Sequence, residues 1–320
     1  TDVVEKDNII VAEQKGKVTT NVNQDLTTSH VAETDNSTKR FETVVEEYQV
    51  IMENGKPYTG DNKIYLNGNG NSKGDEPNGI YSTITAAITD LSERGVSGAV
   101  TFSLVDATYP TETYPFVINS VAGVSATNTV TIKPASGVSP VISGASASGP
   151  IFKIFNTNYV TIDGSNNGTT SRDMSITNTS ATTPQVIWIG SNGTTPITNV
   201  TVKNCNITNG VNTSSAIIVS DGAASGTNGY FNNITIQNNS IKKAYNGVYS
   251  NAVVATGNGS GLVLSNNDIN STGADALTGT ALYVQGVDGV TVSNNNIGNI
   301  THGTLTANST GIWLATGTKN

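Results

Sequence analysis

The chain has 320 residues, of which 12% are charged, and its formal net charge is −8. This acidic balance excludes the basic surface that nucleic-acid binding requires, and no apolar run approaches the ~20 residues of a membrane-spanning helix. The single cysteine, Cys205, excludes a disulfide framework within the chain. Because the first residue is Thr1 and no signal peptide is visible, we interpret the sequence as a processed chain that was secreted.

Residues 1–57 are predicted to form an extended N-terminal segment with one or two β-strands. The stretch 41–52 is rich in residues that favour strands, and a turn is predicted at 54–57. We expect this segment to be an assembly arm.

Residues 58–115 are predicted to form an N-terminal cap that contains a helix at about 81–94. The apolar residues of the helix recur at helical spacing: Ile84, Ala87, Ile88 and Leu91. Gly95 ends the pattern. An amphipathic helix at this place would cover the apolar end of a stacked fold.

Residues 116–320 are predicted to form the coils of that fold, because a short phrase recurs there. It has five positions. The first and third are apolar, the second is usually Thr, the fourth varies, and the fifth is Asn. Its four full copies lie at 200–207, 234–241, 262–269 and 290–297. The copies start at 200, 234, 262 and 290, which gives steps of 34, 28 and 28 residues, and a shorter copy lies at 174–178. This period predicts an all-β fold, a parallel β-solenoid.

The Asn in each phrase is predicted to form a sharp corner, because Asn tolerates left-handed backbone. The apolar residues before it would point inward and the residue between them outward. Stacked coils would then place the corner side chains above one another in a ladder: Asn178, Asn204, Asn238, Asn266 and Asn294.

A second set of short strands lies between the phrases, at 186–189, 216–219, 247–249, 281–284 and 311–314. Strand alternation places one column of these residues inward and the next outward. The outward column is predicted to bind a ligand, such as a surface polysaccharide, through aromatic side chains: Trp188, Tyr249, Tyr283 and Trp313. The alternative is that a loop or the N-terminal segment covers this column.

Residues 80–91 and 99–109 resemble the helix, strand and lead-in of the right-handed parallel β-helix superfamily, the pectate-lyase-like fold, although Asp106 and Ala107 stand where that lead-in usually has Gly. Residues 121–132 and 159–165 are similar to large secreted surface proteins of Bacteroidota-type bacteria. The resemblance covers about residues 77–320. It implies a right-handed parallel β-helix outside the cell or on its surface, and no particular activity.

The alternative function is that of a polysaccharide lyase or another carbohydrate-active enzyme, since the same superfamily contains such enzymes. A lyase needs a base and often calcium. The candidate residues share one outward strand position or lie near it in the sequence: Lys133, Asp163, Lys203 and Arg172. The competing interpretation is a surface ladder of alternating charge, which contributes little stability.

The remaining carboxylates and histidines form no recognisable catalytic or metal-binding motif. The other carboxylates are scattered, whereas glycosidases need two of them flanking one bond. His30 and His302 lie in polar loops, and no EF-hand-type loop is found. We therefore expect no cofactor and no metal site, and leave calcium open.

We expect a non-catalytic, extracellular structural or adhesive β-solenoid. Self-association is expected through the N-terminal segment and through the C-terminal coil, which shows no capping pattern after residues 311–314. Such head-to-tail contact would build a cell-surface filament. Whether the parent protein continues beyond Asn320 is left open.

Overall fold

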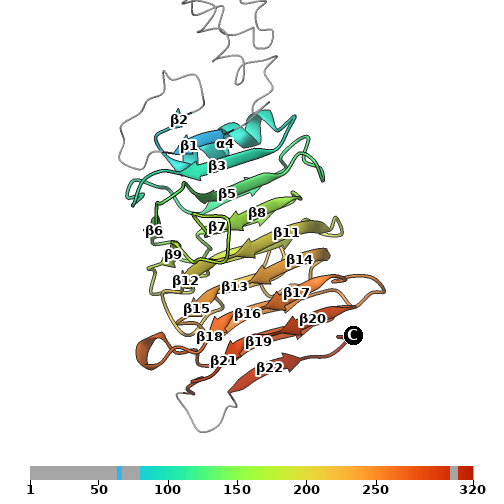
Figure 1. The fold of residues 1–320 in the computed structure, drawn as a ribbon. Helices are drawn as coiled ribbons and strands as arrows, with labels where there is room; N and C mark the ends of the chain where they lie inside the picture. The colour runs from blue at the N-terminus through green and yellow to red at the C-terminus, as the bar shows by residue number, and fades with distance from the viewer. Residues whose placement is uncertain (1–62, 67–79, 303–308, 320) are drawn as a thin grey trace, which may run out of the picture.

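Three parallel β-sheets wind around one core in the computed structural model, which describes residues 63–66, 80–302 and 309–319 (Figure 1). The sheets contain 9, 7 and 6 strands. Strands of one sheet come from successive coils, so that the coils stack along a single axis. The parallel β-solenoid predicted from the repeat is confirmed.

The 9-stranded sheet contains the strands of the repeat phrase. Its strands are, in spatial order, β2 (Ile80–Tyr81), β1 (Lys63–Leu66), β3 (Val100–Leu104), β5 (Val130–Pro134), β8 (Val160–Asp163), β11 (Ile197–Lys203), β14 (Phe231–Gln237), β17 (Leu262–Ser265) and β20 (Val290–Ser293). The 6-stranded sheet follows the Asn corner. Its strands are β21 (Asn296–Ile297), β18 (Asp268–Ile269), β15 (Ser240–Lys242), β12 (Cys205–Thr208), β9 (Met174–Asn178) and β6 (Val141–Gly144).

The 7-stranded sheet carries the aromatic column. Its strands are β22 (Thr310–Leu314), β19 (Thr280–Gln285), β16 (Asn246–Asn251), β13 (Ile217–Asp221), β10 (Ile187–Ser191), β7 (Phe152–Phe155) and β4 (Phe116–Asn119). A short 3-10 helix, η2 (Gly273–Asp275), precedes β19.

Alternation along each strand builds the core. In β11, Val200 and Val202 are fully buried, whereas Thr201 between them lies partly exposed on the outer face. Val202 pairs in register with Ile236 of β14 and Ile162 of β8. Aliphatic side chains therefore stack in columns along the axis, and burying one of this size stabilises the fold by about 1.5–3 kcal/mol.

One helix, α4 (Ile84–Arg94), closes the N-terminal end of the core. The hydroxyl of Thr83 caps it by accepting from the N–H of Ala86 over 3.0 Å, and Gly95 ends it with a φ of 74°. Its buried residues are the predicted ones: Ile84, Ala87, Ile88 and Leu91. The predicted helix is confirmed. β3, which follows it, already belongs to the 9-stranded sheet, so the coils begin before residue 116.

The short copy of the phrase at Met174–Asn178 does not lie in the same sheet as the four full copies, although the ladder prediction requires this. This strand, β9, pairs with β12 in the 6-stranded sheet, and the partner of β11 one coil earlier is β8. The sequence pattern does not distinguish the two sheets, because strands of both alternate apolar residues with Ser or Thr.

The last described coil leaves its apolar residues open. Leu282 and Val284 of β19 are fully buried, but Ile312 and Leu314, their partners in β22, are 47% and 48% exposed. The predictions for residues 1–57, including His30, lie outside the described residues. None of the described helices has the length and apolar character needed to cross a bilayer.

Candidate functional site

The predicted corner is present in four of the five copies. These residues have φ between 53° and 60°: Asn204, Asn238, Asn266 and Asn294. The prediction that Asn178 belongs to this ladder is wrong, because β9 lies in another sheet. Gly164 occupies the corner instead, and a Cβ at this residue would lie 2.0 Å from the carbonyl oxygen of Asn204. Among the described residues, the side-chain amide ladder at this corner joins only Asn204 and Asn238, over 2.7 Å.

A second Asn ladder, which we did not predict, lies one residue further along and is more deeply buried. Nδ2 of Asn239 donates to Oδ1 of Asn267 over 3.2 Å, and Nδ2 of Asn267 donates to Oδ1 of Asn295 over 3.0 Å. The first coil of the series has Cys205 in this position, where its N–H donates to Oδ1 of Asn239 over 3.0 Å. Burial raises the pKa of the Cys205 thiol, with a smaller contribution from Asp163, so this cysteine is a structural residue.

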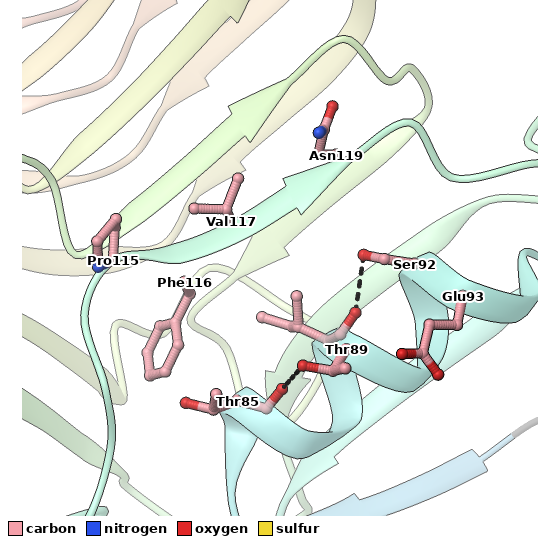
Figure 2. Close-up of a pocket in the computed structure, with 9 residues that line it drawn as sticks. Thr85, Thr89, Ser92, Glu93, Pro115, Phe116, Val117 and Asn119 are labelled. Carbon is pink, nitrogen blue, oxygen red and sulfur yellow. Dashed lines mark hydrogen bonds between the residues drawn. The ribbon is translucent and has the colours of Figure 1, made fainter.

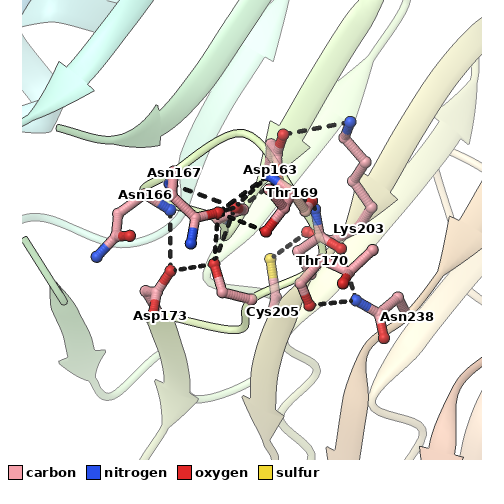
Figure 3. A network of polar contacts seen from close by, with 12 residues as sticks. Asp163, Asn166, Asn167, Thr169, Thr170, Asp173, Lys203, Cys205 and Asn238 are labelled. Carbon is pink, nitrogen blue, oxygen red and sulfur yellow. Dashed lines mark hydrogen bonds and ion pairs between the residues drawn. The ribbon is translucent and has the colours of Figure 1, made fainter. Parts of the chain in front are cut away.

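Three of the four residues of the lyase hypothesis, Asp163, Lys203 and Arg172, are held in hydrogen bonds or ion pairs around this corner (Figure 3). Asp163 accepts from the Lys203 ammonium over 3.2 Å and from Nδ2 of Asn204 over 2.6 Å. Arg172 contacts the corner after β14, where its Nε donates to the carbonyl oxygen of Asn238 over 2.8 Å. Lys133 lies on the same sheet, in β5. The structure thus brings Asp163 and Lys203 together as an ion pair, and it uses Arg172 to fasten a loop.

That loop has an oxygen-bearing side chain at every second position from Asp163 to Asp173. The oxygens bond to one another: Oδ1 of Asn167 accepts from Oγ of Ser165 over 2.9 Å, and Oδ2 of Asp173 accepts from Oγ of Ser171 over 2.6 Å (Figure 3). Only the first and last members are carboxylates. If calcium binds this chain, these oxygens are the ligands that it would prefer. Within the part of the chain that is described, no group of three His, Cys, Asp or Glu side chains comes close enough to hold a metal.

The outward column of the 7-stranded sheet has the predicted register. Trp188 pairs with Ile218, Ile218 with Tyr249, Tyr249 with Tyr283, and Tyr283 with Trp313. Trp188 and Ile218 are buried, Tyr249 and Tyr283 are partly exposed, and Trp313 is 51% exposed. The column is therefore covered at one end and open at the other.

Lys153 covers Trp188. It lies one coil earlier in the same column, and its ammonium sits 4.3 Å from the centre of the indole ring. The ammonium also donates to the carbonyl oxygen of Gly222 over 2.7 Å, which ties down the loop after β13. Burial lowers the pKa of Lys153, and Asp221 opposes this shift. Trp188 therefore cannot offer a ring face to a ligand.

The open part of the column adjoins a groove. The rings of Tyr249 and Tyr283 stack 4.9 Å apart at 16°, and the Trp313 ring meets Tyr283 edge-on at 5.3 Å. The other face of Tyr249 looks toward Ile218, where the smaller side chain leaves a groove of 280 Å³. The groove is otherwise lined mainly by polar residues: Thr183, Gln185, Ser214, Ser215, Ser225 and Gly226.

Among the described residues that line the groove, Gln185 is the one with a buried polar side-chain atom that has no hydrogen-bond partner. Its side chain is 7% exposed, its Nε2 donates to the carbonyl oxygen of Thr183 over 2.7 Å, and its Oε1 has no partner among the described residues. Burial, and then the neighbouring Tyr283, raises the pKa of Tyr249. Sequence reasoning missed Gln185 because it precedes the strand and shows no periodicity.

Comparisons with protein-family models, curated proteins and solved structures found no match. The β-helix resemblance therefore rests on the sequence motifs and on the solenoid itself. Because one fold supports many activities, the function has to be argued from the groove and its surroundings.

Proposed function

We propose that this chain is a non-catalytic, extracellular β-solenoid that binds a glycan on the outer face of its 7-stranded sheet. The observation that carries the proposal is the groove beside Tyr249, which joins an open aromatic face to a wall of hydroxyl and amide groups. The extracellular location rests on the resemblance to secreted surface proteins.

A sugar ring suits the chemistry of this groove. One face of a pyranose presents C–H groups that pack on an aromatic ring, and its edge carries hydroxyls that need donors and acceptors. Tyr249 supplies the aromatic face, and the hydroxyl of Ser215 is one of the groups on the wall. Oε1 of Gln185 accepts no hydrogen bond from any described residue, and a ligand hydroxyl would supply the donor after a small rotation of the amide.

The exposed end of the column extends this site along the axis. Trp313 lies two coils beyond Tyr249, and successive coils are about 4.8 Å apart. A glycan chain that runs parallel to the axis would therefore contact both residues about 10 Å apart. This arrangement favours an extended polysaccharide over a single sugar.

The bonds of Lys203 and Arg172, two of the lyase candidates, support a role without catalysis. A base must be free to accept a proton from substrate. Lys203 is paired with Asp163, and Arg172 donates a hydrogen bond to the backbone of Asn238. Both side chains therefore stabilise contacts between the described coils.

Binding to a panel of neutral and acidic polysaccharides, measured by isothermal titration calorimetry, tests the proposal. We expect Tyr249→Ala to weaken binding at least tenfold and Trp313→Ala to weaken it less. Tyr245→Ala is the matched control, because this tyrosine is 42% exposed but lies outside the column. Binding that survives both column substitutions would contradict the proposal. Absorbance of unsaturated products in the same mixtures would instead identify a lyase.

Head-to-tail assembly is a second candidate function, favoured by the exposed apolar residues of β22. Ile312 and Leu314 would be buried if another coil stacked on them, and the outer edge of β22 has no partner strand among the described residues. Electron microscopy of the purified chain tests this. Filaments that disappear in Leu314→Asp are expected, and strictly single particles at high concentration would contradict assembly.

A further inference from the structure

Within the described part of the chain, the N-terminal edge of the 7-stranded sheet has no partner strand. β4 pairs with β7 on one side, and no strand of the described residues pairs with its other side. At the same end of the molecule, the 9-stranded sheet continues past β3 with β1 and β2. At this end the 9-stranded sheet therefore extends further than the 7-stranded sheet. A further strand of the 7-stranded sheet would lie beside β4.

The backbone of β4 shows which groups face this position. The N–H of Phe116 donates to the carbonyl oxygen of Ile151, next to β7, over 2.8 Å. Successive residues of a strand direct their N–H and C=O groups to opposite neighbours. The N–H and C=O of Val117 therefore point to the open side, as does the N–H of Asn119. An edge of this kind is a template for another strand.

A groove of 380 Å³ runs along this edge, between α4 and β4 (Figure 2). The helix contributes a stripe along its length that begins at Thr85, includes Ile88 and ends at Glu93. The strand contributes Phe116, Val117 and Asn119, and Pro115 lies just before it. A long, narrow site with hydroxyls on one side and free backbone groups on the other suits an extended peptide.

We propose that residues 48–52 of this chain occupy the open edge of β4 as a further strand. In this five-residue sequence Tyr48, Val50 and Met52 share one face, and Gln49 and Ile51 share the other. Tyr48, Val50 and Ile51 belong to the β-branched and aromatic types that pack well on a half-buried sheet surface. The first face would lie toward the core, where Phe116 and Ile88 end the apolar column.

The length of the connection to β1 agrees with this placement. Ten residues, 53–62, separate Met52 from Lys63. Ten residues, 120–129, also lead from β4 in the 7-stranded sheet to β5 in the 9-stranded sheet, and 252–261 do the same from β16 to β17. Because α4 packs against both β1 and β4, the gap is far shorter than the ~33 Å that ten residues can span.

Residue-resolved amide hydrogen exchange on the full chain tests the proposal. We expect the amides of Val117 and Asn119 to be protected, and Val50→Pro to speed their exchange at least tenfold by removing a donor from the added strand. Val11→Pro, elsewhere in the N-terminal segment, is the matched control and should change nothing. Unchanged protection of the Val202 amide would show that the coils remain folded. Unprotected Val117, or protection that Val50→Pro leaves intact, would overturn the proposal.

Disulfide trapping separates the chain's own segment from that of a second copy. Gln49, Val50 and Ile51 are each replaced by Cys in a chain that also carries Val117→Cys, and the native Cys205 is buried and unreactive. At least one pair should close within a single chain under mild oxidation. Cross-linked dimers or longer ladders would assign the site to a second copy and overturn the proposal as stated. Because no glycan is involved, the result is independent of the proposed binding function.

Discussion

The side-chain amide of Asn239 donates to Oδ1 of Asn267 over 3.2 Å, and the backbone N–H of Asn239 donates to the same oxygen over 3.0 Å. Nδ2 of Asn267 also donates to the carbonyl oxygen of Ile236 over 2.9 Å. One buried amide thus closes the corner of its own coil onto the coil before it, because it can donate and accept at the same time.

Replacing Asn267 by Gly should lower the free energy of unfolding by about 2–4 kcal/mol, because the two buried donors of Asn239 lose their acceptor and the carbonyl oxygen of Ile236 loses a donor. Asn266→Gly is the matched control. Asn266 is exposed with a φ of 56°, which Gly adopts freely, so this change should cost less than about 1 kcal/mol. Urea unfolding followed by circular dichroism measures both. Equal losses would show that the buried ladder has no special role.

Gly164→Ala should be among the most damaging single changes in the corner. The new Cβ would lie 2.0 Å from the carbonyl oxygen of Asn204, and backbone cannot move aside cheaply. A loss of about 3 kcal/mol or more is expected, as for overpacking elsewhere. Gly168→Ala controls for the loop, because open space surrounds that position and only its φ of 76° costs about 1–2 kcal/mol. Comparable unfolding midpoints would refute the steric argument.

Arg172→Gln should loosen the loop that Arg172 fastens to Asn238. The guanidinium is 25% exposed, so we expect a loss of about 1 kcal/mol, below the range for buried charged hydrogen bonds. Limited proteolysis should then cut within residues 165–171 faster than in the parent chain. Lys133→Gln, another change of a cation to Gln on this side of the molecule, should leave the cleavage rate unchanged. A loop that stays resistant would mean that its internal bonds suffice.

Alkaline pH should weaken the fold, in part through Tyr114. Burial raises the pKa of Tyr114 to about 12, from the ordinary value of 10.0. Between these pH values the folded chain binds more protons than the unfolded chain, so the free energy of unfolding falls as the pH rises. Tyr114→Phe should reduce this fall. Its hydroxyl has no partner within the described residues, so the change should be neutral or stabilise by up to about 1 kcal/mol at pH 7. A loss at pH 7 would reveal a partner for the hydroxyl.

Local pattern was enough to predict the strands and the corner but not which of two adjacent Asn residues is buried. Asn238 and Asn239 are both polar and both follow β14. The left-handed backbone of Asn238 turns its side chain to the outer side of the corner, and Asn239 then points inward. Only the path of the chain through the corner distinguishes the two residues, and this path cannot be predicted from the residue type alone.

Which aromatic ring of the column is exposed depends on residues that are distant in sequence. Trp188 and Trp313 occupy the same register column and share the same residue type. Trp188 is covered because Lys153, from the previous coil, lies over it and bonds to Gly222, 69 residues further along the chain. Trp313 is open because none of the described coils follows it.

The sequence by itself determined the period, the inward and outward columns, the capping helix and the left-handed corners, because each of these follows from the chemistry of residues within one strand or one turn. Only the tertiary structure decided which sheet β9 joins, which Asn column is buried, which aromatic ring remains open and where the edge of a sheet lacks a partner. Those features depend on contacts between coils, and such contacts are set by the lengths and paths of loops, on which strand alternation places no constraint.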